Sequence, residues 1–238
     1  MGLNLFGVNS VERIVDVPRS YTRKVRWLPQ IGDIFPNFRA ETTMGPISFH
    51  PWAEGNWVML FSHPAAFTPV CTTEIAAYAT FESDFARRGV KILGMSQCSV
   101  ETQRAWHEDI RDIFKVEIRF PMIADQSGDL SDIFGMFHPK AAADYSIRKS
   151  FIVDPSLRIR MIFEYPTMVG RGTEEILRVI DALQTVDTYQ MGTPADWERG
   201  DDCLLPSGMT DQQTTASYGT GWRKLRPYLK MIANPWAV

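Results

Sequence analysis

The chain has 238 residues, of which 45% are hydrophobic and 22% charged, a composition typical of a globular protein with a sizeable core. Its formal net charge of -3 offers no basic patch to displace counterions from phosphates, which argues against nucleic acid as a partner. No apolar run approaches the roughly 20 residues that a membrane-spanning helix needs, so we expect no membrane partner either.

Three cysteines, Cys71, Cys98 and Cys203, are odd in number and widely spaced. They form no C-x-x-C pair and no cysteine–histidine cluster with zinc spacing, so we predict neither a structural disulfide framework nor a metal site. A reducing compartment is the default for such a chain. We therefore expect a cytoplasmic protein without a metal, haem or flavin cofactor.

The first 27 residues mix charged with hydrophobic side chains and are expected to form an N-terminal extension. A nearly continuous apolar run over residues 56–63 then predicts a strand buried on both faces. The helix expected after it contains Cys71 and ends at Gly89, because its apolar residues recur at spacings of three and four. A second buried strand is predicted over residues 90–96.

Ser99 is expected to begin a helix that runs to residue 114. A strand over residues 119–125 and a shorter helix over residues 127–137 should follow. The next two strands, 149–154 and 158–165, flank the turn sequence Asp-Pro-Ser-Leu and should pair as a hairpin. The last regular helix is predicted over 173–186, with Thr173 as its N-cap.

Strands separated by helices imply crossover connections and a mostly parallel central sheet, to which the hairpin adds an antiparallel edge. We therefore predict a three-layer α/β domain with a thioredoxin-like fold over residues 28–187. Residues 188–238 are rich in Gly, Pro, Ser, Thr and Asp and are expected to form an irregular C-terminal arm. The aromatic residues of this arm are poorly suited to solvent, so we expect it to pack on another subunit.

The segment "HPAAFTPVCTTE", residues 63–74, places a cysteine at a predicted helix start. Thr68 suits the N-cap and Pro69 the first helical position, which puts Cys71 at the third. An acid is usual there, because unpaired amides and the helix dipole favour a negative charge. A thiol in its place should maintain a reactive thiolate population. Pro64 should shield this sulfur from bulk water.

The spacing Pro64-x-x-x-Thr68-x-x-Cys71 resembles the active-site signature of the peroxiredoxins, particularly their one-cysteine, peroxiredoxin-6-like group. The segment "SIRKSFIVDP" resembles the one in which that family places its active-site arginine, here Arg148. The segment "YPTMVGRGTEEILRVIDALQ" is similar to the stretch with a second arginine, here Arg171, and "TPADWERGDD" is similar to the start of that group's C-terminal arm. The resemblance covers about Leu28 to Leu205, which is most of the chain.

The resemblance implies a thiol-dependent peroxidase that reduces hydrogen peroxide and alkyl hydroperoxides through a sulfenic acid at Cys71. Arg148 would stabilise the thiolate and the developing charge. Thr68 and backbone amides would hold both oxygens in line, and Pro64 would limit access of solvent.

Three further residues are expected to lie around this site without touching the peroxide. Glu74 would orient an arginine by pairing with it, Arg171 is a candidate partner, and His63 would contact the cysteine's surroundings. The resemblance also implies a homodimer or ring of dimers and an external thiol reductant of the thioredoxin, glutaredoxin or glutathione type.

The sequence is also compatible with three other functions or mechanisms. Cys203 lies close to where two-cysteine members keep a resolving cysteine, and it would then form an intersubunit disulfide with Cys71. A cysteine hydrolase or acyl transferase would instead use His63 as its base. A non-enzymatic holdase-like oligomer would use the fold only as a scaffold.

Overall fold

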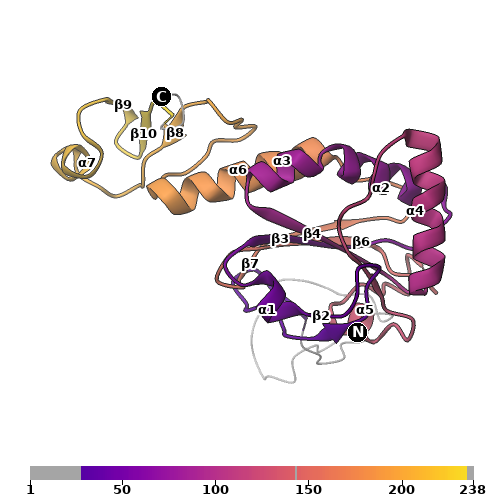
Figure 1. Ribbon diagram of the computed structural model, residues 1–238. Coiled ribbons are helices and arrows are strands. Elements are labelled where there is room, and N and C mark those ends of the chain that lie inside the picture. The colour runs from indigo at the N-terminus through magenta and orange to yellow at the C-terminus, as the bar shows by residue number, and fades with distance from the viewer. Residues whose placement is uncertain (1–27, 143, 235–238) are drawn as a thin grey trace, which may run out of the picture.

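The computed structural model describes residues 28–142 and 144–234. A five-stranded sheet lies between two layers of helices, and a separate arm extends from one end of this domain (Figure 1). The predicted N-terminal extension, residues 1–27, lies outside the described residues.

The central sheet has the strand order β5-β4-β3-β6-β7. Its strands are β3 (Trp57–Ser62), β4 (Val90–Ser96), β5 (Met122–Ala124), β6 (Arg148–Val153) and β7 (Ile159–Tyr165). β4 pairs in parallel with β3 and β5, while β6 pairs antiparallel with β3 and β7. Within this sheet, β6 is thus the strand that runs against the others, which confirms the predicted mostly parallel sheet with an antiparallel hairpin. The same pairing brings the start of β6 beside the end of β3.

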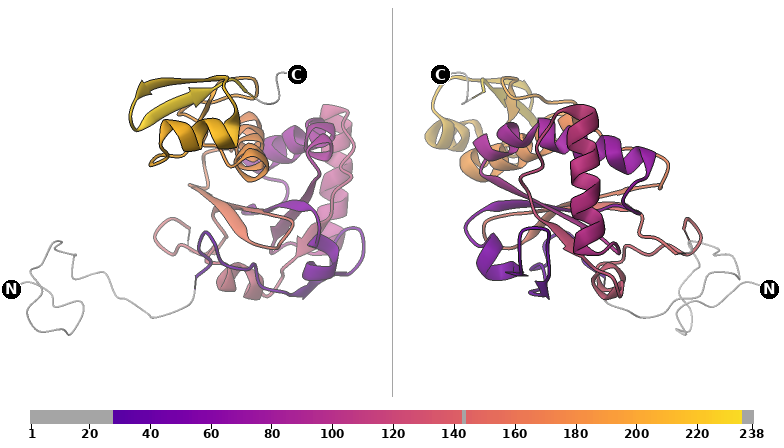
Figure 2. Two further views of the ribbon diagram at one scale, coloured as in Figure 1. Left: turned by 90° about the vertical axis from the view of Figure 1, so that its left-hand side faces the viewer. Right: turned by 45° about the vertical axis from the view of Figure 1, so that its right-hand side comes forward.

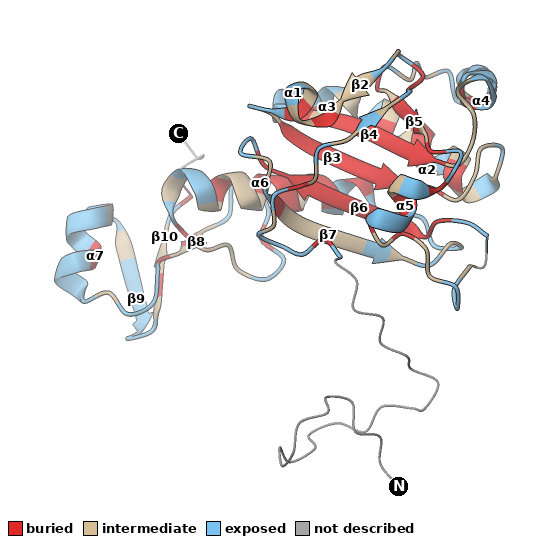
Figure 3. Cartoon of the chain, turned by 90° about the horizontal axis from the view of Figure 1, so that it is seen from below, coloured by how far each residue is buried: buried red, intermediate tan, exposed pale blue. Residues whose placement is uncertain are grey.

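Continuous apolar sequence produces the burial of these central strands, as expected for strands covered on both faces. β3 and β6 are buried at every residue, and the red central strands of Figure 3 show this layer. Gly94 of β4 allows close packing, because a Cβ atom there would lie 2.1 Å from Sδ of Met122 on β5 and 2.9 Å from the ring of Phe61, and both side chains would have to shift.

The helices form two layers around the sheet, as predicted. One layer contains α2 (Pro69–Thr80), α3 (Glu82–Arg87), α4 (Val100–Phe114) and α6 (Thr173–Tyr189). Their apolar faces share a core with Met59 and Phe61 of β3. The other face is covered by α1 (Phe49–Ala53), α5 (Asp129–Ile133) and the small hairpin of β1 (Arg39–Ala40) and β2 (Ile47–Ser48) (Figure 1). Among the described residues, no helix is long and apolar enough to span a bilayer.

Several helix boundaries differ from the prediction: α5 is shorter than the predicted 127–137, and α6 runs on to Tyr189. The single helix expected up to Gly89 is interrupted at Phe81, whose φ of -91° and ψ of 9° leave the helix, and α3 begins anew with acids in its first turn. The N-cap of α6 is Gly172 and not Thr173. A hydrogen bond from the main-chain nitrogen of Arg171 to Glu74 holds the chain just before this helix. The N-cap therefore lies one residue earlier than predicted, and the helix begins at Thr173.

The C-terminal arm is more regular than predicted. It contains β8 (Cys203–Leu204), α7 (Asp211–Tyr218), β9 (Trp222–Arg226) and β10 (Leu229–Ile232), with the three strands in one antiparallel sheet. A capping box of Thr210 and Gln213 starts α7, and a small core around the buried Trp197 holds the arm together. The arm lies beyond the C-terminal end of α6 in Figure 1, and in the left view of Figure 2 it faces the viewer.

Candidate active site

Cys71 lies in the first turn of α2, as the sequence predicted. Thr68 is the N-cap with an extended backbone, and Pro69 is the first helical residue. The first intrahelical bond runs from the nitrogen of Thr72 to the carbonyl of Thr68, at 2.9 Å. The preceding amides, those of Val70 and Cys71, therefore lack partners within the helix and place partial positive charge at its start.

The loop that joins β3 to α2 leads directly to Cys71. Phe67 has a φ of 56°, a left-handed conformation that costs a bulky residue of order 1–3 kcal/mol. Thr68 makes no side-chain cap; its hydroxyl donates instead to the carbonyl of Ala65 at 2.9 Å. Since this bond uses the hydroxyl proton, the oxygen of Thr68 keeps its capacity to accept a hydrogen bond.

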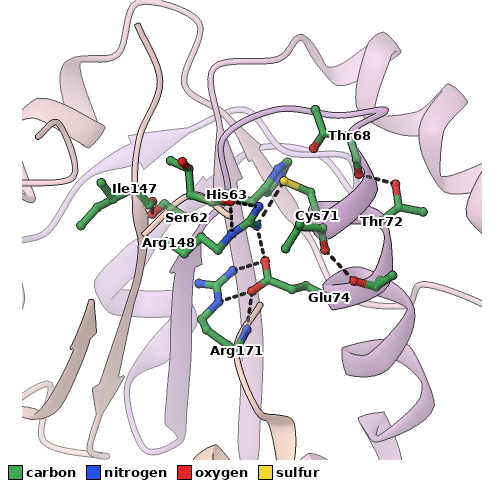
Figure 4. Close-up of polar contacts among 12 residues, drawn as sticks. Ser62, His63, Thr68, Cys71, Thr72, Glu74, Ile147, Arg148 and Arg171 are labelled. Atoms are coloured by element: carbon green, nitrogen blue, oxygen red, sulfur yellow. Dashed lines mark hydrogen bonds and ion pairs between the residues drawn. The ribbon is translucent and has the colours of Figure 1, made fainter. Parts of the chain in front are cut away.

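The thiol is buried and faces an arginine. Cys71 is 0% exposed, and Nη1 of Arg148 lies 3.3 Å from its Sγ (Figure 4). Arg148 is the first residue of β6, which the sheet places beside the loop after β3. Its Nε and Nη2 donate to the carbonyl of Thr167 at 2.9 and 2.6 Å, so Nη1 is left facing the sulfur.

Glu74, one turn after Cys71 on α2, joins two arginines. Its Oε2 accepts from Nη1 of Arg148 at 2.6 Å and from Nη2 of Arg171 at 2.8 Å. Its Oε1 accepts from Nε of Arg171 at 2.8 Å. Figure 4 shows the two guanidinium groups converging on this carboxylate. Two buried cations against one carboxylate leave a surplus of positive charge beside the sulfur.

His63 is buried at the end of β3 but does not bond the cysteine. Neither of its ring nitrogens has a hydrogen-bond partner within the described part of the chain, and its ring packs on Trp106 at a centroid distance of 5.1 Å. Burial, with the charges of Arg171 and Arg148, lowers the pKa of His63 to about 3. An imidazole with so low a pKa is a weak base, and it makes no hydrogen bond to Cys71, so this geometry does not support the hydrolase alternative.

A cavity of about 290 Å³ lies beside Arg148. Pro64, Thr68, Tyr145 and Met168 also line it. Tyr145 and Met168 are exposed at its mouth. The cavity therefore joins solvent to the guanidinium beside Cys71, and it is large enough for a small oxygen-containing molecule.

The remaining two cysteines lie elsewhere. Cys203 is buried in the core of the arm. In Figure 1 the arm and α2, the helix of Cys71, lie at opposite ends of the molecule. Burial raises the pKa of the Cys203 thiol. Cys98, which the sequence did not single out, accepts a hydrogen bond from the nitrogen of Ala66 at 3.3 Å. It therefore helps to anchor the loop that leads to Cys71.

The sequence did not predict the contribution of Thr167, whose carbonyl oxygen accepts two hydrogen bonds from Arg148. Every residue type has such a group, so no sequence signal marks it. The same reasoning named no metal ligands, and among residues 28–142 and 144–234 no group of three or more His, Cys, Asp and Glu residues is arranged to hold a metal ion.

Comparison with protein families gives two matches. Residues 31–162 match the model of the AhpC/TSA family, and residues 182–221 match that of the C-terminal domain of 1-Cys peroxiredoxin. The chain is 36% identical over 206 residues to "1-Cys peroxiredoxin" of Dictyostelium discoideum, which covers 87% of this chain and 86% of that protein. It is 40% identical over 206 residues to "Peroxiredoxin PRX1, mitochondrial" of Saccharomyces cerevisiae, covering 84% and 78%.

Solved structures agree with this result. A structure of the yeast mitochondrial 1-Cys peroxiredoxin, which concerns thiol resolving via glutathione/thioredoxin systems, has a TM-score of 0.82 at 38% identity. The match covers 87% of this chain and 100% of the yeast chain. A variant of Peroxiredoxin 6 from Arenicola marina gives a TM-score of 0.81 at 35% identity, covering 87% and 98%.

Proposed function

The chain belongs to the AhpC/TSA family of peroxiredoxins, with a thioredoxin-like fold and thiol-dependent peroxidase activity, and on this premise we propose that Cys71 is its peroxidatic residue. The observation that carries the proposal is the 3.3 Å contact between Nη1 of Arg148 and the buried Sγ of Cys71 at a helix start. It joins a nucleophile to a fixed cation that lines the cavity.

The proposed reaction is a displacement at oxygen. The thiolate of Cys71 attacks one oxygen of hydrogen peroxide or an alkyl hydroperoxide, the O–O bond breaks, and the other oxygen leaves as hydroxide or alkoxide. A proton converts this leaving group to water or alcohol, and Cys71 is left as a sulfenic acid. The sulfur has lost two electrons and the peroxide has gained them.

The surrounding residues have distinct parts in this step. Arg148 stabilises the thiolate and the charge that develops as the O–O bond breaks. Thr68 offers a hydroxyl oxygen that accepts from the incoming peroxide, which fixes its direction of approach. Pro64 restricts the cavity, while Glu74 and Arg171 hold Arg148 in place. His63 packs behind the site as a neutral ring.

We propose that the sulfenic acid is reduced by an external thiol of the thioredoxin, glutaredoxin or glutathione type. The yeast relative, whose thiol is resolved via glutathione/thioredoxin systems, supports this choice. The position of Cys203 in the core of the arm also favours a one-cysteine cycle. Leu225 and Tyr228 of the arm are 45% and 71% exposed, which supports the proposed homodimer or ring of dimers.

The compartment is also a proposal. The sparse, unpaired cysteines favour the cytoplasm, whereas the yeast relative is mitochondrial. Cell fractionation with an antibody to the native chain distinguishes these two locations.

The proposal is tested by adding one equivalent of hydrogen peroxide to the reduced protein. We expect a sulfenic acid, trapped by a dimedone adduct, at Cys71, and no peroxide consumption by Cys71→Ser. If Cys71→Ser retains activity, the proposed role is wrong. If the parent protein does not react with peroxide at all, the holdase-like alternative is favoured.

A further inference from the structure

The end of β3 and the start of β6 are joined by a serine hydroxyl where the regular ladder stops. The two strands pair as far as Phe61 and Ser150. One residue further, Oγ of Ser62 donates to the carbonyl of Ile147 at 2.6 Å and accepts from the nitrogen of Lys149 at 3.1 Å (Figure 4). The side chain thus replaces the main-chain bonds that the ladder no longer provides.

A second serine makes the reverse connection. Oγ of Ser146, in the segment before β6, donates to the carbonyl of His63 at 3.2 Å. Ser62 and Ser146, here called the serine clasp, are 0% and 1% exposed. Because water does not reach them, removing a hydroxyl would leave its buried partners one bond short. The two partners of Ser62 also share a bond, from the nitrogen of Lys149 to the carbonyl of Ile147 at 3.2 Å, and this bond would remain. The clasp therefore ties the loop leading to the cysteine to the segment carrying the arginine.

We propose that Ser62 is a positioning residue of the peroxidase reaction, which acts by holding the main chain on both sides of Arg148. Its two partners, Ile147 and Lys149, are the chain neighbours of that arginine. The inference rests on the roles proposed above for Cys71 and Arg148.

The geometry explains why this anchor matters to the chemistry. The far end of Arg148 is held by the carbonyl of Thr167 and by Glu74. Its main chain is paired with Tyr165 of β7 on one side, and the serine clasp holds the side that faces β3. Nη1 lies 3.3 Å from Sγ of Cys71, within the ordinary range of a hydrogen bond to sulfur. A main-chain shift of about 1 Å would remove this donor from the sulfur, and misplacements of that size cost up to ~100-fold in rate.

The test measures the rate of sulfenic acid formation at Cys71 in Ser62→Ala and Ser62→Thr. We expect Ser62→Ala to slow it by about 10- to 100-fold, and Ser62→Thr, which keeps the hydroxyl, to recover most of the rate. Thr43→Ala is the matched control, since Oγ1 of Thr43 accepts from the nitrogen of Met122 at 3.1 Å in the same manner but on β5. This control should lose stability without losing rate.

A double-substitution cycle separates positioning from general damage. In the background of Arg148→Ala, adding Ser62→Ala should slow the reaction no further, because the group that Ser62 positions is already gone. An unchanged rate in Ser62→Ala at a temperature where it is folded would overturn the inference. So would an equal loss in both backgrounds. If Cys71→Ser itself retains activity, the proposed function fails instead, and that result is distinct from either of these.

Discussion

Arg148 and Glu74 form an ion pair of 2.6 Å in which each side chain is only 2% exposed. Arg171 completes the arrangement with a second contact to Glu74 at 2.8 Å. Buried charges of this kind are costly to desolvate and are weak evidence for stability. Their value here is geometric, because they present one guanidinium nitrogen to Cys71.

Replacing Arg148 with alanine should slow sulfenic acid formation at Cys71 by about 10²- to 10³-fold, the usual cost of removing one donor to developing charge. The fold should persist, since Arg171 still neutralises Glu74. Stopped-flow measurement of peroxide reduction gives the rate, and circular dichroism provides the check on folding. Arg148→Lys should be intermediate, because an ammonium does not reproduce the fork of donors. A rate equal to that of the parent chain would contradict the role of Arg148.

Replacing Glu74 with glutamine should destabilise the protein by about 3–5 kcal/mol, because it leaves two buried guanidinium groups without their carboxylate. Urea unfolding measures this loss. Glu175→Gln is the matched control: it breaks a partly exposed pair with Arg178 on α6 and should cost less than ~1 kcal/mol. Similar losses in the two variants would show that the buried network contributes nothing special.

Stability should fall with acid through His63. Burial lowers its folded pKa from 6.5 to about 3, so between these values the unfolded chain binds more protons than the folded one. The contribution is complete above pH 6.5 and is lost as the pH falls toward 3, by up to about 1.4 kcal/mol per pH unit. His107, with a pKa lowered by burial to about 4, acts in the same direction.

Urea unfolding on both sides of pH 6.5 tests this expectation. His63→Phe keeps a flat ring beside Trp106 and should flatten the dependence on pH. If the variant shows the same acid sensitivity as the parent chain, His63 is not the group responsible.

Cys203 should be dispensable for the reaction with peroxide. Its thiol lies in the core of the arm, and burial raises its pKa, which lowers its thiolate fraction. We expect Cys203→Ser to react at the parent rate and to give the same non-reducing gel pattern after a peroxide pulse. A disulfide-linked dimer that requires both Cys71 and Cys203 would instead establish the two-cysteine alternative.

Local sequence patterns predicted most of the elements. β4 occupies the predicted residues 90–96, and Ser99 caps α4 through a bond from the nitrogen of Thr102. The turn at Asp154 forms the expected hairpin. These features depend on neighbours within a few residues, so periodicity and capping chemistry suffice to find them. The break at Phe81 was missed because the apolar spacing continues across it.

The sequence by itself determined that Cys71 would stand at a helix start, since Thr68 and Pro69 specify that start within three residues. Only the tertiary structure decided what faces the sulfur. Cys71 and Arg148 are 77 residues apart in the chain, and the register of β6 against β3 brings them together. A contact of this kind depends on the pairing of strands that are distant in the chain and on the burial of their charges. The free energy of that pairing cannot be inferred from any short stretch of residues.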